Sequence, residues 1–346
     1  MNLQQTVMVM EHLPLSEIAL ERRLAIEEED TVAMEGIFSS IREGIGNIVN
    51  GARSDFALSS ISDNQNIQLI KKLSSKLKGK TQLKQETPLI EINHYSKWLK
   101  IHGEVIHDGN RIIVELERIL TLSRTFLNAY LPALEHLFHY TADTFLEKAL
   151  VNEKKAAREL SPNIKEFYPK QFDSVLTKRL IGVHKLVGES KAPVRASNVY
   201  LGNWFVASNT LDHPGYTNLL PVIVNVNDNP INGIEPRMYV LPYTSQQTAR
   251  IMNLISEILA LETSLTEWNN FKDSGNKIDR LCHQYEMMHA NFEHYSEEQK
   301  VLVLEVIEIA QSVFREYKTL SFFANIVNRL SFVILQVCEG SIHRME

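Results

Sequence analysis

The sequence predicts a mainly α protein, a large helical body with a small inserted antiparallel β-sheet (α+β). Hydrophobic residues recur every three to four positions through most of the chain, which is the period of an amphipathic helix. The exception is residues 195–242, where short β-branched and aromatic runs alternate with turn-forming residues. The chain has 346 residues, of which 44% are hydrophobic and 23% charged. This composition is typical of a globular protein and excludes a mostly disordered or low-complexity chain.

Helical periodicity recurs in separate segments along the chain. We expect helices at about residues 15–29, 31–53, 111–150, 164–187, 245–271, 275–294 and 297–338. Pro132 should kink or split its helix, because proline lacks the backbone donor that a helix interior needs. The amphipathic helix at 31–53 has two interpretations, packing on the protein's own core or docking on a membrane or partner.

The strands are expected at residues 199–207, 219–226 and 237–241, which are rich in β-branched and aromatic residues. They are short, and turn-forming residues separate the last two. We therefore expect a small sheet rather than a β domain.

One apolar stretch is long enough to cross a bilayer. Between residues 319 and 338 the only charged side chain is that of Arg329. Asn325 and Asn328 lie beside it, where a membrane makes polar groups most costly. We interpret this stretch as a buried core helix and expect no transmembrane span.

Acidic residues gather at the N-terminal end. Residues 1–35 hold eight acidic and two basic side chains, a net charge of −6 that equals the net charge of the whole chain. The remainder is formally neutral, which argues against non-specific coating of nucleic acid. We interpret 1–35 as an acidic propeptide-like segment, 36–86 as an amphipathic helix plus a basic linker, and 87–346 as the helical body that carries the β insertion.

A polar run and a basic run follow the first amphipathic helix. Residues 59–66 are rich in Ser, Asp and Asn and predict a linker. The basic run is a candidate for contact with nucleic-acid phosphates through Lys71, Lys72, Lys76, Lys78 and Lys80. No aromatic residues are interleaved with these lysines, so a solvated face is the alternative.

The common catalytic motifs are missing from the sequence. It has no phosphate-binding loop, no dinucleotide-binding glycine motif and no Gly-x-Ser-x-Gly elbow. Two cysteines, Cys282 and Cys338, are too few for a disulfide framework or a four-cysteine zinc site. We expect no cofactor and no enzymatic activity.

A metal site is the alternative that the residue spacing allows. Glu135, His139 and Asp143 are four residues apart and share one helical face. Glu286 and His289 have the Glu-x-x-His spacing that di-iron carboxylate proteins use twice. The second function we consider is therefore an intracellular helical enzyme or host-directed effector with a carboxylate/histidine metal site.

The end of the acidic segment reads Ala33-Met34-Glu35-Gly36. It resembles the Ala/Ser-x-Glu site that head-maturation proteases cut in large tailed bacteriophages, in particular giant phages of the phiKZ type. Inner-head proteins of that group are similar in plan, with an acidic propeptide, the cut and a mostly helical body. The triplet type also occurs at Ala19–Glu21, Ala25–Glu27, Ala133–Glu135, Ala157–Glu159 and Ala260–Glu262. The Ala33 triplet differs because it ends the acidic segment and precedes a glycine. The triplets at Ala133 and Ala260, in contrast, lie in expected long helices.

This resemblance implies a non-enzymatic virion structural protein of the head interior. It implies trimming after Glu35 by a head-maturation protease, and assembly in the host cytoplasm before enclosure in the virion. The implied partners are other virion head proteins, that protease, and packaged DNA through the lysines of the basic run.

Overall fold

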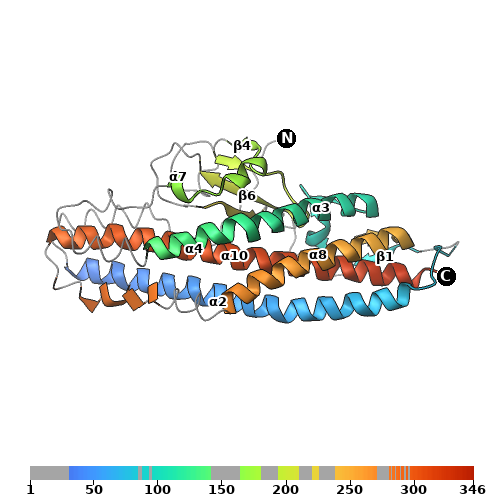
Figure 1. Ribbon diagram of the computed structural model, residues 1–346, viewed down its shortest axis with the longest axis horizontal. Coiled ribbons are helices and arrows are strands. Elements are labelled where there is room, and N and C mark those ends of the chain that lie inside the picture. The colour runs from blue at the N-terminus through green and yellow to red at the C-terminus, as the bar shows by residue number, and fades with distance from the viewer. Residues whose placement is uncertain are drawn as a thin grey trace.

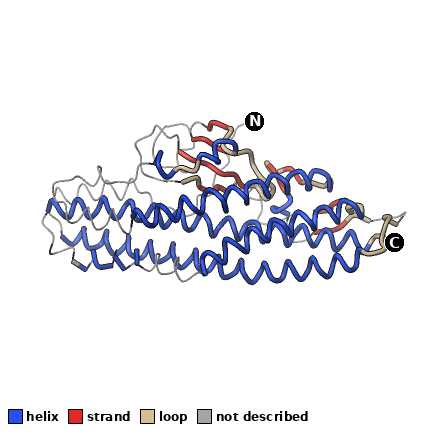
Figure 2. Tube along the Cα trace, viewed as in Figure 1, coloured by secondary structure: helices blue, strands red, loops and turns tan. Residues whose placement is uncertain are grey.

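The computed structural model is mostly helical, with small antiparallel sheets, of which the main one lies on one side of the helices (Figures 1 and 2). The mainly α fold class with an inserted sheet is therefore confirmed. The structure describes residues 31–84, 88–92, 96–141, 164–180, 194–209, 220–225, 238–270, parts of 280–294, and 297–346.

Long helices in the described part of the chain form an elongated bundle (Figure 1). They are α2 (Thr31–Leu77), α3 (Gly109–Thr125) continued by α4 (Leu131–His139), α8 (Ser245–Asn270) and α10 (Glu297–His343). The bounds of α8 and α10 agree with the predicted helices at 245–271 and 297–338, because both carry the helical period almost without interruption.

The four helical elements run as two parallel pairs of opposite direction (Figure 1). On α2 and α10, Asp55 contacts Asn325 and, further along both helices, Lys76 contacts Glu339. On the α3–α4 element and α8, three side-chain hydrogen bonds each join residues 133 positions apart, Glu117–Arg250, Arg124–Glu257 and Glu135–Trp268. The constant offset shows that these two elements pack in one register along their length.

Helix α2 continues through residues 59–66, so the linker predicted there is wrong. Ser59, Asp63 and Asn66 are only 1%, 3% and 1% exposed. They lie four and three residues apart, which places them on one face of α2. The apolar side chains of α2 join the same core as the rest of the bundle, so the helix is held by packing although its middle is polar.

The α3–α4 element changes its winding before Pro132. Asp108 caps α3, because its side chain accepts a hydrogen bond of 3.1 Å from the backbone N–H of Asn110. A π-helical segment, Phe126–Tyr130, then joins α3 to α4, and Pro132 lies in the first turn of α4. The wider π turn accommodates the residue that lacks a backbone donor, so the predicted split at Pro132 is confirmed.

The main sheet is a four-stranded antiparallel meander. Its strands, in sequence order, are β4 (Lys178–Leu180), β5 (Val194–Ala196), β6 (Trp204–Asn209) and β7 (Val222–Asn225). It begins earlier than the predicted insertion. The helix expected at 164–187 is wrong over its described part, residues 164–180, which form α7 (Ile164–Phe167), a 3-10 turn (Lys170–Ser174) and β4.

Two smaller antiparallel pairs complete the strands described. The predicted third strand, β8 (Met238–Val240), pairs with β1 (Ile90–Ile92) instead of joining the main sheet. A hairpin joins β2 (Lys100–Ile101) to β3 (Glu104–Val105) after a 3-10 turn at Ser96–Leu99. His102 and Gly103 both have positive φ, as a two-residue type I′ turn requires.

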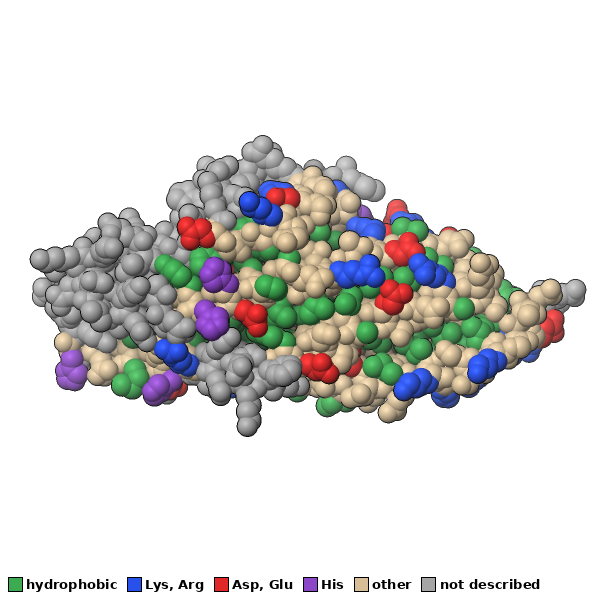
Figure 3. Space-filling view, in the orientation of Figure 1, with side chains coloured by type: hydrophobic (Ala, Val, Ile, Leu, Met, Phe, Trp, Pro, Cys, Tyr) green, Lys and Arg blue, Asp and Glu red, His purple; other side chains and the backbone are tan. Residues whose placement is uncertain are grey.

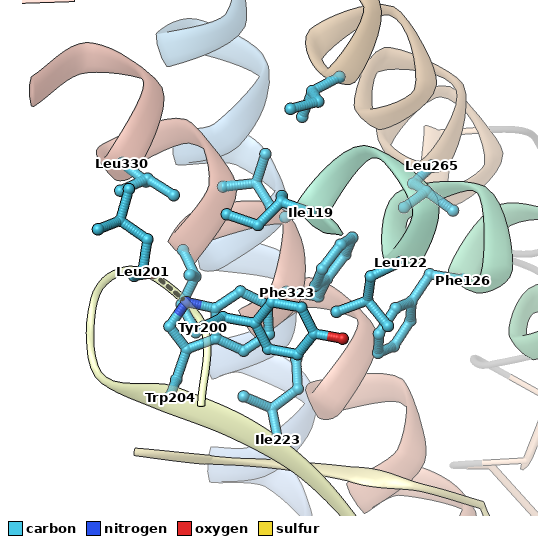
Figure 4. Close-up of a cluster of buried hydrophobic side chains, with 14 of the residues drawn as sticks. Ile119, Leu122, Phe126, Tyr200, Leu201, Trp204, Ile223, Leu265, Phe323 and Leu330 are labelled. Carbon is cyan, nitrogen blue, oxygen red and sulfur yellow. Dashed lines mark hydrogen bonds between the residues drawn. The ribbon is translucent and has the colours of Figure 1, made fainter. Parts of the chain in front are cut away.

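The core lies where the main sheet meets the bundle (Figure 4). Trp204 of β6 is fully buried, stacks on Tyr200 at 4.7 Å between ring centroids, and meets Phe323 of α10 edge-on at 6.1 Å. Phe323 in turn stacks on Phe126 at 4.1 Å. These rings join the sheet to α10 and to the π-helical segment between α3 and α4 through a continuous aromatic contact.

Helix α10 contains the apolar stretch that is long enough to span a membrane. In the described part of the chain, Val313–His343 passes that test of length and composition, and 72% of its most apolar window is buried inside the protein. This burial agrees with the interpretation of a core helix, since α2 and α8 cover its apolar face.

Candidate functional site

The predicted cleavage site lies near the start of α2. Ala33 to Gly36 occupy the first two turns of this helix, which begins at Thr31. The structure describes burial along α2 from Gly46 on, and the first buried side chain there is Val49, at 4% exposure. The first turn of a helix has backbone N–H groups without intrahelical acceptors, and helix ends open at low cost. The bond after Glu35 is therefore helical, but close to the end that unwinds most readily.

The competing triplets in the described residues lie deeper in the bundle. Glu135, which ends one of them, is in α4 and accepts a 2.7 Å hydrogen bond from Nε1 of Trp268. Glu262, which ends another, is in the middle of α8 and 1% exposed. A protease would have to unfold part of the packed bundle to reach either. The triplets that end at Glu21, Glu27 and Glu159 lie outside the described residues.

The residues of the alternative metal site are not gathered by the structure. Glu135 and His139 are one turn apart on α4, and Glu286 is exposed on a different segment. Asp143 and His289 lie outside the described residues. Across the part of the chain that the structure describes, no three His, Cys, Asp or Glu side chains form a group that could hold a metal ion. No observation here favours the enzyme alternative.

The basic run is partly tied to the end of the chain. Lys76 and Lys72 approach Oε1 of Glu339 at 3.0 and 3.7 Å, and these contacts lower the pKa of Glu339, the Lys76 hydrogen bond most. Lys80 donates a 2.6 Å hydrogen bond to the carbonyl of Met345. Lys71 and Lys78 are exposed. Contact between the basic run and DNA stays a prediction, and Lys71 and Lys78 are the main candidates for that contact.

A polar cluster that sequence reasoning did not predict lies inside the bundle. We call it the Asp63–Glu262 cluster. It consists of side chains from α2, α8 and α10, each at most 3% exposed: Ser59, Asp63, Asn66, Glu262 and Asn328.

Asn328 is at the centre of this cluster. Its amide nitrogen donates to Oε1 of Glu262 and, at 3.3 Å, to the carbonyl oxygen of Ser59. Nδ2 of Asn66 donates to the side-chain and backbone oxygens of Asn328, both at 3.2 Å. One asparagine of α10 therefore connects α2 to α8.

The cluster holds two carboxyl groups in an environment that disfavours their charge. Burial raises the pKa of Asp63 from 3.8 to about 7, although the neighbouring Asn328 amide lowers it. Burial also raises the pKa of Glu262 well above its usual value, the charge of Asp63 raises it further, and the Asn328 hydrogen bond lowers it. The two carboxyls therefore interact across the interface of α2 and α8, and their proton affinities depend on each other.

Two sequence signals pointed to this cluster without identifying it. The polar run at 59–66 and the asparagines at 325 and 328 in an apolar stretch are each unusual for their surroundings. In the structure the run and Asn328 are partners, since Asn328 donates to the Ser59 carbonyl and accepts from Asn66. Asn325 bonds Asp55, one turn before the run, at 2.8 Å. Glu262 lies in a leucine-rich helix, at a position of the helical period where an apolar residue is usual. An acidic residue at such a position is the only signal that the sequence gives for Glu262.

Comparison of the chain with protein-family models, curated proteins and solved structures found no match.

The burial of the Asp63–Glu262 cluster limits what its carboxyls do. Paired carboxyls with raised pKa values are suited to proton transfer. Both carboxylate oxygens of Asp63 and Oε2 of Glu262 are, however, shielded from solvent. An organic substrate would have to separate α2 from α8 to reach them. The arrangement suits the binding of a proton or a small ion better than catalysis on an external substrate.

We expect Asp63→Asn to weaken the pH dependence of stability. The pKa of Asp63 is higher in the folded chain than in the unfolded chain, so the folded state binds the proton more tightly. The free energy of unfolding should then fall as the pH rises from about 4 to about 7. The contribution of Asp63 to this fall is at most on the order of 4 kcal/mol. Urea unfolding in chelator-containing buffer at both ends of this range measures the fall.

The matched control for this prediction is Asp55→Asn, which changes another α2 carboxyl but keeps the acceptor for Asn325. It should retain the wild-type pH dependence. An equal fall in wild type and Asp63→Asn would contradict the assigned role of Asp63.

Proposed function

We propose that this chain is a non-enzymatic structural protein of a bacteriophage virion. It assembles with other head proteins in the host cytoplasm, is enclosed in the head, and is trimmed after Glu35 by a head-maturation protease. The mature chain begins at Gly36.

The position of the Ala33–Glu35 triplet carries this proposal. It ends the acidic segment and starts a long helix, whereas the triplets ending at Glu135 and Glu262 lie within packed helices. Cleavage after Glu35 removes only the first five residues of α2 and leaves every described core residue in place. A protease specific for this triplet can therefore trim the chain without dismantling the bundle.

The charge distribution supports the same proposal. Loss of residues 1–35 removes a net charge of −6 and leaves a formally neutral body. On the face shown in Figure 3, basic and acidic side chains lie among one another instead of forming one charged area. A neutral surface of mixed charge is compatible with tightly packed DNA, while the acidic precursor would be repelled by it.

Protection of the protein from an external protease tests its location inside the virion head. In intact virions treated with an external protease, the protein should survive in full, and it should be digested once the heads are opened by osmotic shock. A surface-exposed capsid protein of the same particles is the control that must be digested in both. Absence of the protein from purified particles, or its digestion in intact ones, would contradict the proposal.

A further inference from the structure

The Asp63–Glu262 cluster contains more acceptor oxygens than donors. Within the described residues, the buried oxygens without a hydrogen-bond partner include Oδ1 and Oδ2 of Asp63, Oε2 of Glu262 and Oγ of Ser59. Ser59 and Asp63 are one turn apart on the same face of α2, and Asn328 reaches both α2 and Glu262. Four unpartnered oxygens on two helices, both contacted by Asn328, thus have one hydroxyl hydrogen among them.

The donors around the cluster are already used. The Asn328 amide is directed at Glu262 and at the Ser59 carbonyl, and it lies close enough to Asp63 to lower the pKa of that carboxyl. The Asn66 amide is directed at Asn328. Among charged side chains on the same helices, Asp55 bonds Asn325 and Arg329 is exposed. In the described part of the chain, no Lys, Arg or His pairs with either carboxyl of the cluster.

Two carboxylates without a cation are unstable in a protein interior. A buried ionised carboxylate costs several kcal/mol unless it is paired, and at low pH bound protons remove this cost, as the raised pKa values of both carboxyls indicate. Above about pH 7, where Asp63 loses its proton, the cluster requires another source of positive charge. A divalent cation would balance both carboxylates, and the unpartnered oxygens are the ligands available to it.

We propose that the Asp63–Glu262 cluster is a binding site for a hard divalent cation, Ca²⁺ in preference to Mg²⁺. The free ligands are all oxygens. Soft metals prefer sulfur and nitrogen ligands, so an all-oxygen site favours a hard cation. Ca²⁺ accepts irregular sets of six to eight oxygens, whereas Mg²⁺ demands a near-ideal octahedron and keeps its waters. Two carboxylates and a hydroxyl from two helices form an irregular set. The bound ion joins α2 to α8 at the middle of the bundle.

The full chain, freed of metal with chelator and held at about pH 8, provides the test, because the carboxyls are then least protonated. CaCl₂ at about 100-fold above its Kd should raise the thermal midpoint by on the order of 5 °C, and MgCl₂ should raise it less. Elemental analysis after removal of free metal should find one Ca²⁺ per chain. Asp63→Asn and Glu262→Gln should each abolish the shift, and Asp55→Asn should keep it.

The remaining outcomes overturn the site. No Ca²⁺ binding to the wild type, or a shift that persists in Asp63→Asn, would do so. If Ca²⁺ has no effect and Glu262→Gln stabilises the chain at about pH 8, the cluster holds a shared proton instead. Should one variant fail to fold, the other variant and the wild-type stoichiometry still decide. None of these results bears on whether the chain is a trimmed virion protein, which the particle experiment tests separately.

Discussion

Asn328→Leu is expected to destabilise the protein by about 3–5 kcal/mol, since it leaves several buried polar groups without partners at once. Leucine has nearly the shape of asparagine, so the change leaves no large cavity. It removes the donor to Oε1 of Glu262 and to the carbonyl of Ser59, and the acceptor for Nδ2 of Asn66. Unpaired buried groups cost more than a hydrogen bond contributes, and a carboxyl costs most. Urea unfolding at neutral pH measures the change.

The adjacent residue provides the control for this prediction. Arg329 is exposed on α10, so Arg329→Leu should change stability by no more than about 0.5 kcal/mol. If Asn328→Leu were as mild as Arg329→Leu, Asn328 would not connect α2, α8 and α10 in the folded protein.

Trp204→Ala is expected to cost about 3–5 kcal/mol, because it empties the largest fully buried side chain at the contact between sheet and bundle. The indole stacks on Tyr200, meets Phe323 and donates a 2.8 Å hydrogen bond from Nε1 to the carbonyl of Leu201 (Figure 4). Its loss should release the sheet before the helices. Hydrogen exchange should therefore accelerate in β5–β7 more than in α8.

The control for Trp204→Ala is Tyr239→Ala on β8. Tyr239 is 44% exposed, so its truncation should change stability by at most about 0.5 kcal/mol. Uniform acceleration of exchange through sheet and helices would contradict a separate role for Trp204 in holding the sheet.

Helices with an unbroken apolar period were predictable from the sequence. The bounds of α8 and α10 follow from this period, and Pro132 marks the change of winding between α3 and α4. The continuation of α2 through residues 59–66 was not predictable in this way. Polar residues normally indicate a solvated segment, and only the asparagines of α10, more than 260 positions away in the sequence, make their burial favourable.

Pairing between strands that are far apart in the sequence also could not be predicted from local sequence patterns. Strand β8 has the composition of its neighbours, yet it pairs with β1, about 150 residues earlier. The Asp63–Glu262 cluster has the same origin. Its residues are unusual for their own segments, but the chemistry arises only because three helices bring the carboxyls and amides together. The processing site is the opposite case, since its signal is a local sequence pattern and stays a prediction.

The N-terminal residue of the chain in purified particles tests the proposed function most directly. Intact-mass spectrometry of the protein extracted from virions, with peptide mapping of its first residues, identifies that residue. The account predicts a single mature form that begins at Gly36, with peptides from residues 1–30 depleted relative to peptides of the body. Recovery of residues 1–30 at the abundance of the body, in particles that contain the protein, would contradict it.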